Sequence, residues 1–153
     1  MEIRKLSENH ETLDMVKVYT DGGSRGNPGP AAIGILFVHK DEIIMKYSEY
    51  LGTKTNNQAE YTAVIRALEL CQQFSCARVE FFSDSLLVIQ QLKGLYKIRN
   101  RQLQCLYFEV RAREKHIKSL AYHHVLRGNP FIIKADRLVN EKLDEIAEKE
   151  TIL

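Results

Sequence analysis

The sequence predicts an α/β fold in a single domain. Segments of β-prone residues alternate along the chain with segments whose apolar residues recur at helical spacing. Two predicted strands, over residues 16–20 and 79–83, end directly before an aspartate, Asp21 and Asp84. In a parallel pairing, the carboxyl ends of neighbouring strands meet at one edge of the sheet, where open α/β folds bind their ligands. The two aspartates are therefore expected to lie at a functional edge of a mixed sheet.

The composition fits one domain with one core. The chain has 153 residues, of which 44% are hydrophobic, and we expect a polar leader over residues 1–14 and a single domain over 15–153. The formal net charge is only +2, so a surface that binds nucleic acid must come from locally clustered cations. No apolar run reaches the ~18 residues of a membrane span. We therefore expect no membrane contact. We also expect a monomer.

The cysteines indicate a cytoplasmic protein. The chain has three of them, an odd number without Cys-x-x-Cys spacing, in apolar surroundings. Reduced, buried thiols are the expected state, since disulfides form mainly in oxidising compartments.

The first half is expected to form three strands and a helix. The predicted strands cover residues 16–20, 31–40 and 43–51. The Gly/Asn/Pro-rich run from Gly22 to Pro30 joins the first two strands, and Asp41-Glu42 turns between the second and third. The helix runs from about Asn57 to Phe74, with Thr55 or Asn56 as its cap.

The second half is expected to alternate strands and helices. The predicted strands cover residues 79–83 and 120–126. The predicted helices open at Ser85 with an apolar stripe as far as Leu95, lie within 97–118 and run over about 133–148. The stretch from Arg127 to Pro130 breaks the chain before the last helix. The middle helix has a basic outer face that is either ordinary solvated surface or a track for a phosphate backbone. Its cations are Arg99, Arg101, Arg111, Arg113, Lys115 and Lys118.

Four carboxylates could converge at one end of this sheet. Asp21 and Asp84 end strands, whereas Glu60 and Asp136 lie on the inward side near helix starts. Three of them also have a simpler interpretation: Asp21 as a solvated turn residue, Glu60 as a first-turn acid favoured by the helix dipole, and Asp84 as a helix cap. Clustered acids need either shared protons or bound cations. Oxygen-only ligands suit Mg²⁺ or Mn²⁺, and two such ions about 3.5–4 Å apart promote displacement at phosphorus. The chemistry expected is phosphodiester hydrolysis.

The sequence around these acids resembles type 1 ribonuclease H. The stretches that carry the resemblance are Tyr19–Pro30 (YTDGGSRGNPGP), Thr55–Tyr61 (TNNQAEY), Ser83–Ser85 (SDS) and Ala135–Leu138 (ADRL), in the family's order. The resemblance implies a ribonuclease H-like fold, a five-stranded mixed sheet in the order β-β-β-α-β-α-α-β-α with helices on both faces. It also implies endonucleolytic cleavage of the RNA strand of RNA/DNA hybrids, leaving 3′-hydroxyl and 5′-phosphate ends.

The same resemblance assigns the site residues. It makes Asp21, Glu60, Asp84 and Asp136 the catalytic set, binding two Mg²⁺ ions for which Mn²⁺ can substitute. The expected substrate contacts are Gly22, Gly23, Asn27, Thr55, Asn56, Asn57 and Arg127. Glycines permit close approach to a minor groove, and asparagine can both donate to and accept from a 2′-hydroxyl. Thr55 is expected near a phosphate of the DNA strand, and Arg127 near another phosphate.

The sequence also departs from the family. Residues 127–134 contain none of the histidine that many members carry in this loop, and His123 and His124 fall on the preceding strand, where we expect packed or edge imidazoles without a catalytic role. The chain has no tryptophan, so it lacks the Trp-containing basic protrusion of some bacterial relatives. It resembles the compact subgroup known from archaea and some bacteria, some of which accept double-stranded RNA.

Two alternatives remain, one within the nucleases and one from a different class. A DNA-directed nuclease could use the same fold and acids, although such enzymes usually bring further domains. A non-catalytic module that binds RNA or hybrids predicts the loss of an acid, and all four are present. A phosphate-loop nucleotide binder is excluded because the glycine run lacks the Gly-Lys-Ser/Thr ending.

Overall fold

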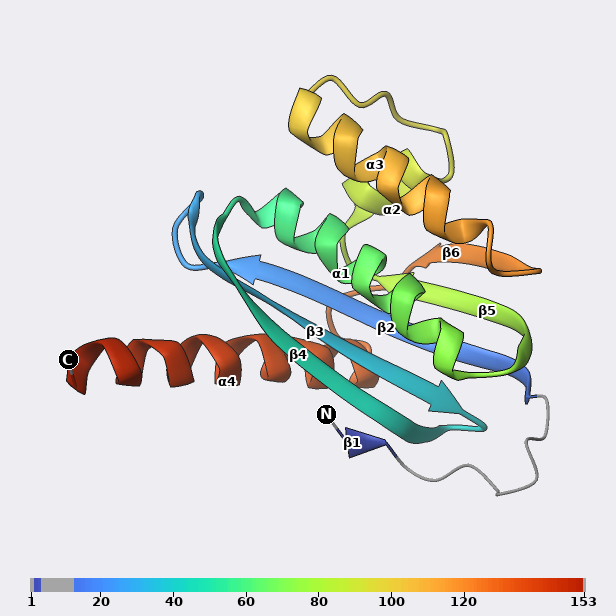
Figure 1. The fold of residues 1–153 in the computed structure, drawn as a ribbon, viewed down its shortest axis with the longest axis horizontal. Coiled ribbons are helices and arrows are strands. Elements are labelled where there is room, and N and C mark those ends of the chain that lie inside the picture. The colour runs from blue at the N-terminus through green and yellow to red at the C-terminus, as the bar shows by residue number, and fades with distance from the viewer. Residues whose placement is uncertain (1, 4–12, 153) are drawn as a thin grey trace.

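One mixed sheet runs through the domain in the computed structural model, which describes residues 2–3 and 13–152 (Figure 1). Its order within the described residues is β1-β4-β3-β2-β5-β6. The strands are β1 (Glu2–Ile3), β2 (Leu13–Ser24), β3 (Gly29–His39), β4 (Glu42–Lys54), β5 (Cys76–Ser83) and β6 (Leu120–His124). The pairs β2/β3 and β3/β4 are antiparallel, whereas β2/β5 and β5/β6 are parallel. The five predicted strands are confirmed, although the last ends at His124 instead of Leu126, and the two-residue β1 is added beside β4.

Helices cover both faces of this sheet (Figure 1). They are α1 (Asn56–Leu70), α2 (Leu86–Leu92), α3 (Arg101–Glu114) and α4 (Pro130–Ile152), with the 3-10 turn η1 (Cys71–Gln73) after α1. Alternate residues of the central strands point to opposite faces of the sheet. Ile33 and Ile35 pack in the core with α1, while Leu36 packs with α4. This is the period-two alternation of a strand buried on both sides. None of the described helices is long and apolar enough to cross a membrane.

The register of β2 and β5 places the two strand-end aspartates together. Tyr19 pairs with Phe82 at the end of the parallel ladder, and Asp21 and Asp84 each lie two residues further on. The prediction that β2 stops at Asp21 is wrong, because β2 continues to Ser24 through antiparallel pairing with β3. The parallel pairing of β2 with β5 therefore ends before the two aspartates. The antiparallel pairing of β2 with β3 continues beyond Asp21 through Gly22 and Gly23.

The predicted helix ends need three corrections. The last helix begins at Pro130 instead of Ile133, because proline occupies the first helical position and Asn129 Oδ1 accepts from the N–H groups of Phe131 and Ile132 (3.0 and 3.3 Å). The first helix passes into η1 at Cys71 instead of continuing to Phe74. The helix that Ser85 caps ends at Leu92, so Leu95, expected on its apolar stripe, lies 68% exposed in the connection that follows.

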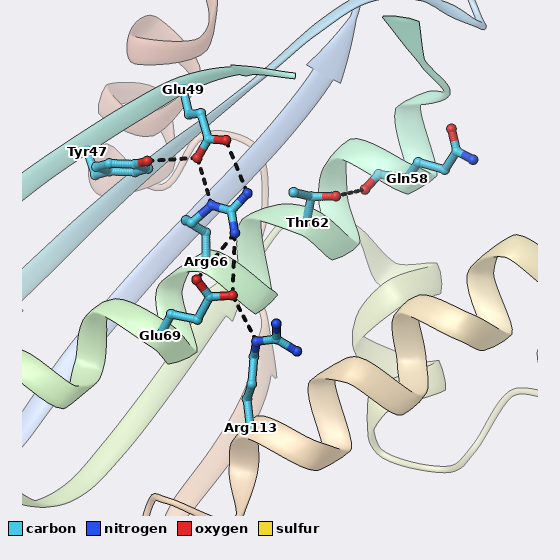
Figure 2. A network of polar contacts seen from close by, with 7 residues as sticks. All are labelled: Tyr47, Glu49, Gln58, Thr62, Arg66, Glu69 and Arg113. Atoms are coloured by element: carbon cyan, nitrogen blue, oxygen red, sulfur yellow. Dashed lines mark hydrogen bonds and ion pairs between the residues drawn. The ribbon is translucent and has the colours of Figure 1, made fainter. Parts of the chain in front are cut away.

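A polar network joins β4, α1 and α3 (Figure 2). Arg66 of α1 donates two hydrogen bonds to the carboxylate of Glu49 on β4 (2.7 and 3.1 Å) and also bonds Glu69. Tyr47 donates to Glu49 (2.7 Å), and Arg113 of α3 donates to Glu69 (2.8 Å). The Arg66 and Tyr47 donors hold the pKa of Glu49 below its usual value against the effect of burial.

Two cations of the predicted basic face are half-buried and bond to groups within the domain. Arg113 belongs to the network above, and Arg111 bonds Tyr107, Glu114 and the backbone carbonyl of Leu92. Both guanidinium groups therefore have partners within the domain. This favours ordinary surface for this part of the face, and the phosphate-backbone alternative stays a prediction. Arg99, Arg101, Lys115 and Lys118 do lie exposed.

Two other expectations concern the cysteines and the leader. The three cysteines are free, with Cys71 buried and Cys76 half-buried. Cys105 is exposed on the outer side of α3, so its predicted burial is wrong. Of the leader predicted over residues 1–14, Glu2–Ile3 forms β1, and β2 begins at Leu13. Residues 1 and 4–12 lie outside the described residues.

Candidate active site

Three carboxylates converge at the end of the β2/β5 ladder. Asp21 comes from β2, Glu60 from α1 and Asp84 from the turn after β5, and one oxygen of each lies within 4.8 Å of the other two. Asp21 and Glu60 are only 7% and 5% exposed, respectively. The acids open into a cavity of about 480 Å³, so a ligand can reach groups that are largely removed from bulk water.

Glu60 is oriented by two donors from the sheet. The backbone N–H of Gly22 donates to its Oε1 at 2.5 Å, and the Ser83 hydroxyl donates to its Oε2 at 3.3 Å. A Cβ on Gly22 would lie 2.4 Å from the carbonyl carbon of Ala59, so α1 approaches β2 this closely only over a glycine. Thr55 caps α1 in a capping box with Gln58, which places Glu60 in the second turn. The alternative of a first-turn acid turned to solvent is wrong.

Asp84 lies between two serines whose hydroxyl groups accept the backbone hydrogen bonds of the turn. Ser83 Oγ accepts from the N–H of Ser85 (3.0 Å), and Ser85 Oγ accepts from the N–H of Val88 (3.3 Å) as the N-cap of α2. The simpler interpretation of Asp84 as a helix cap is therefore wrong. Its carboxylate faces the cavity, 3.9 Å from Nε of Arg127, whose side chain is 95% exposed.

Asp136 lines the same cavity from the opposite sheet face. It is exposed and lies outside the group of three close carboxylates. The prediction that it leans toward the core is wrong, because α4 turns Ile132, Ala135 and Val139 inward and leaves Asp136 beside that stripe. Its charge still contributes to raising the pKa of Asp21.

The site gathers acids with little positive charge to balance them. Burial is the largest cause that raises the pKa of Asp21, to about 10, and repulsion by Glu60 and Asp84 adds to it. Burial likewise raises the pKa of Glu60 to about 7, although the Gly22 N–H stabilises its charged form. Within the described part of the chain, the ion pair that reaches these three acids is Arg127–Asp84. The donor set is oxygen-only and short of positive charge, which suits a hard divalent cation.

Some of the predicted substrate contacts form the wall of this cavity, and others do not. Gly22, Gly23, Asn56 and Arg127 line it. Asn27 lies beside it, because its Oδ1 accepts from the N–H of Asn56 (2.9 Å), while Asn56 Oδ1 accepts from the N–H of Ser24 (3.1 Å). Both bonds use the side-chain oxygens. Thr55 and Asn57 flank Asn56 at the start of α1 and are absent from the cavity wall.

The histidines of β6 lie where the sequence predicts, whereas Ser83 and two isoleucines of the cavity wall were not predicted. His123 pairs with Glu80 (2.7 Å) and stacks on Phe82, and His124 is exposed, which confirms the expectation of packed or edge imidazoles. Sequence reasoning missed the part of Ser83, whose only signal was its place before Asp84. It also missed the apolar wall of the cavity, formed by Ile132 and Ile133.

A mixed sheet that gathers oxygen ligands at the carboxyl ends of two parallel strands defines an α/β protein with a candidate metal-dependent active site. The family model described as "Reverse transcriptase-like" matches residues 19–141. A curated relative, "Ribonuclease H" of Methylococcus capsulatus, is 32% identical over 93% of this chain and 97% of its own length. The chain belongs to the ribonuclease H family.

Other relatives are similar in sequence and structure. "Ribonuclease HI" of Halobacterium salinarum is 41% identical over 85% of this chain, and its crystal structure superposes with a TM-score of 0.81, covering 86% of this chain and 98% of that one. LC11-RNase H1, solved in complex with an RNA/DNA hybrid, has a TM-score of 0.80, 36% identity and coverage of 86% and 99%. The chain spans 65% of the curated Halobacterium protein and 36% of a bifunctional protein of Mycobacterium tuberculosis.

Proposed function

We propose that the protein is an endoribonuclease that hydrolyses the RNA strand of RNA/DNA hybrids and leaves 3′-hydroxyl and 5′-phosphate ends. The observation that carries this proposal is the cluster of Asp21, Glu60 and Asp84 within 4.8 Å, at a cavity that Gly23 and Asn56 also line. Membership of the ribonuclease H family supports it, as does the solved complex of a relative with a hybrid.

The proposed cofactor is Mg²⁺, two ions per site, with Mn²⁺ as a substitute. Asp21, Glu60 and Asp84 would hold it together with Asp136 across the cavity, and the oxygen-only donors fit a hard cation. Bound ions supply activation of a water nucleophile and stabilisation of the leaving oxygen. The chain's own contribution is orientation: the Gly22 N–H and the Ser83 hydroxyl fix both oxygens of Glu60.

The proposed substrate contacts follow the rim of the cavity. Asn27 and Asn56 direct their side-chain oxygens to backbone N–H groups, which leaves both amide NH₂ groups to donate to 2′-hydroxyls, and Asn57 lies next to them. Thr55 is proposed near a DNA-strand phosphate. The exposed Arg127 is proposed to bind a phosphate beside Asp84, since guanidinium groups match phosphate geometry.

The cellular setting is proposed from the thiols. Cys71, Cys76 and Cys105 are free, which supports a reducing compartment such as the cytoplasm. We also propose that the protein acts as a monomer.

The test is cleavage of end-labelled RNA within an RNA/DNA hybrid, with Mg²⁺ and separately with Mn²⁺, beside double-stranded RNA, single-stranded RNA and duplex DNA. Asp84→Asn serves as the inactive control. Selective, metal-dependent cutting of the hybrid's RNA is expected, and cutting of double-stranded RNA would extend the substrate range. Binding without cutting would instead indicate a non-catalytic module, and cutting of duplex DNA would indicate a DNA-directed nuclease.

A further inference from the structure

The connection between β2 and β3, residues 25–28, is fastened to α4 by one side chain. Arg25 Nη2 donates to Asp144 Oδ1 (2.7 Å) and lies 3.4 Å from Asn140 Oδ1 and 3.3 Å from the Asn140 carbonyl oxygen. Helix α4 runs along its sheet face toward the end where β2 passes into β3 (Figure 1). A residue of the glycine-rich run thus reaches a helix more than a hundred residues later in the chain.

The same connection is fastened to α1 on the opposite face. Asn27 Oδ1 accepts from the backbone N–H of Asn56, and Asn56 Oδ1 accepts from the backbone N–H of Ser24. On α4, Asn140 Nδ2 donates to the carbonyl of Asp136 (3.1 Å), so the Arg25 anchor sits one turn from that acid. The connection is therefore held between the helix that carries Glu60 and the helix that carries Asp136.

We propose that Arg25 is a positioning residue for the hybrid, which sets the place of Asn27 against the two helices through its pair with Asp144. This inference rests on the proposed function. Arg25 is absent from the wall of the acidic cavity, and its guanidinium points to an acid of α4. The pair is partly exposed, 41% and 64% for the two side chains, so it adds little to overall stability. Its loss should appear in substrate binding, where a loosened loop must be ordered again.

The experiment compares Arg25→Gln, Asp144→Asn, their combination, and the charge exchange Arg25→Asp with Asp144→Arg. Cleavage kinetics give kcat and KM for a labelled hybrid, and anisotropy in an Asp84→Asn background gives Kd without cutting. Each single variant should raise KM and Kd by about two- to fivefold with kcat unchanged, since an exposed pair contributes little more. The combination should be no worse than either single variant, and the exchange should recover part of the loss.

The matched control is Glu145→Gln, which removes the pairs with Lys142 and Lys149 on the same helix and should behave as the wild type. A direct phosphate contact of Arg25 would overturn the proposal. It would show as weakened binding and a smaller salt slope in Arg25→Gln, with Asp144→Asn unaffected. Unchanged KM and Kd in all variants would also overturn it. Failure of the wild type and Glu145→Gln to cut any hybrid would refute the proposed function separately, while the Kd values still report on Arg25.

Discussion

The backbone N–H of Gly22 donates a 2.5 Å hydrogen bond to Glu60, and these two residues are 38 positions apart. The contact requires α1 to lie directly on β2, which only the missing side chain of Gly22 permits. One short contact therefore fixes β2, α1 and the buried Glu60 relative to one another in the candidate active site.

Gly22→Ala should destabilise the domain by about 1–3 kcal/mol, because the added methyl group overlaps the Ala59 backbone. Cleavage should fall with it, since Glu60 would be displaced. Urea unfolding gives the free energy. The matched control is Gly128→Ala, where a Cβ meets nothing within 4 Å, and an equal loss in both variants would contradict the account of close packing.

Ser83→Ala should lower the affinity for Mg²⁺ by about tenfold, because groups that orient a metal-binding side chain contribute on this scale. The hydroxyl at 3.3 Å from Glu60 would be lost, while Gly22 still holds the other oxygen. The Mg²⁺ dependence of cleavage measures the effect, and Ser83→Thr, which keeps a hydroxyl, should restore it. A wild-type Mg²⁺ dependence in Ser83→Ala would show that the Gly22 bond suffices.

The metal-free protein should lose stability as pH rises. The pKa of Asp21 is raised from 3.8 to about 10, so the folded state holds this proton more tightly than the unfolded chain. The stabilisation is complete below pH 3.8 and declines as pH rises toward about 10. Thermal unfolding in EDTA between pH 5 and 9 should show this slope in the wild type, and a smaller one in Asp21→Asn.

Mg²⁺ should reverse this trend, because its binding displaces the protons and stabilises the folded state more at higher pH. A dependence of stability on pH that Asp21→Asn leaves unchanged would place the titrating groups elsewhere in the domain.

Asp84→Asn removes one negative charge from the site and so relieves repulsion between the acids. This variant should be inactive, yet without metal it should be as stable as the wild type or more stable.

Arg66→Gln should destabilise the domain by about 1–2 kcal/mol, since it leaves Glu49 and Glu69 without their shared donor between β4, α1 and α3 (Figure 2). The side chain of Arg66 is 30% exposed, so solvent limits the loss. Denaturant unfolding measures it, and Lys149→Gln, which breaks an exposed pair on α4, is the control. If the two variants were equally stable, the network around Arg66 would contribute no more than an exposed surface ion pair.

Several features of this protein follow from short-range patterns in its sequence. The apolar, β-prone run over residues 31–38 predicts a strand, and a polar Thr55 or Asn56 before an apolar helical pattern predicts the capped start of α1. Thr55 is the cap. The position of Asp21 and Asp84 after matching strands predicts their meeting, and the observed parallel register brings it about. These features depend on neighbours in the chain, which is why periodicity and turn chemistry identify them.

Other features were decided only by the tertiary structure. That Asp136 lies exposed in the cavity wall depends on which face of α4 packs against the sheet, and Ile132, Ala135 and Val139 form that face. Whether Arg111 and Arg113 face solvent depends on acids and carbonyls of other elements, above all Glu69 and Leu92. The donors to Glu60 and the anchor of Arg25 likewise lie far away in sequence. Such contacts are set by packing and strand register, and no local pattern contains them.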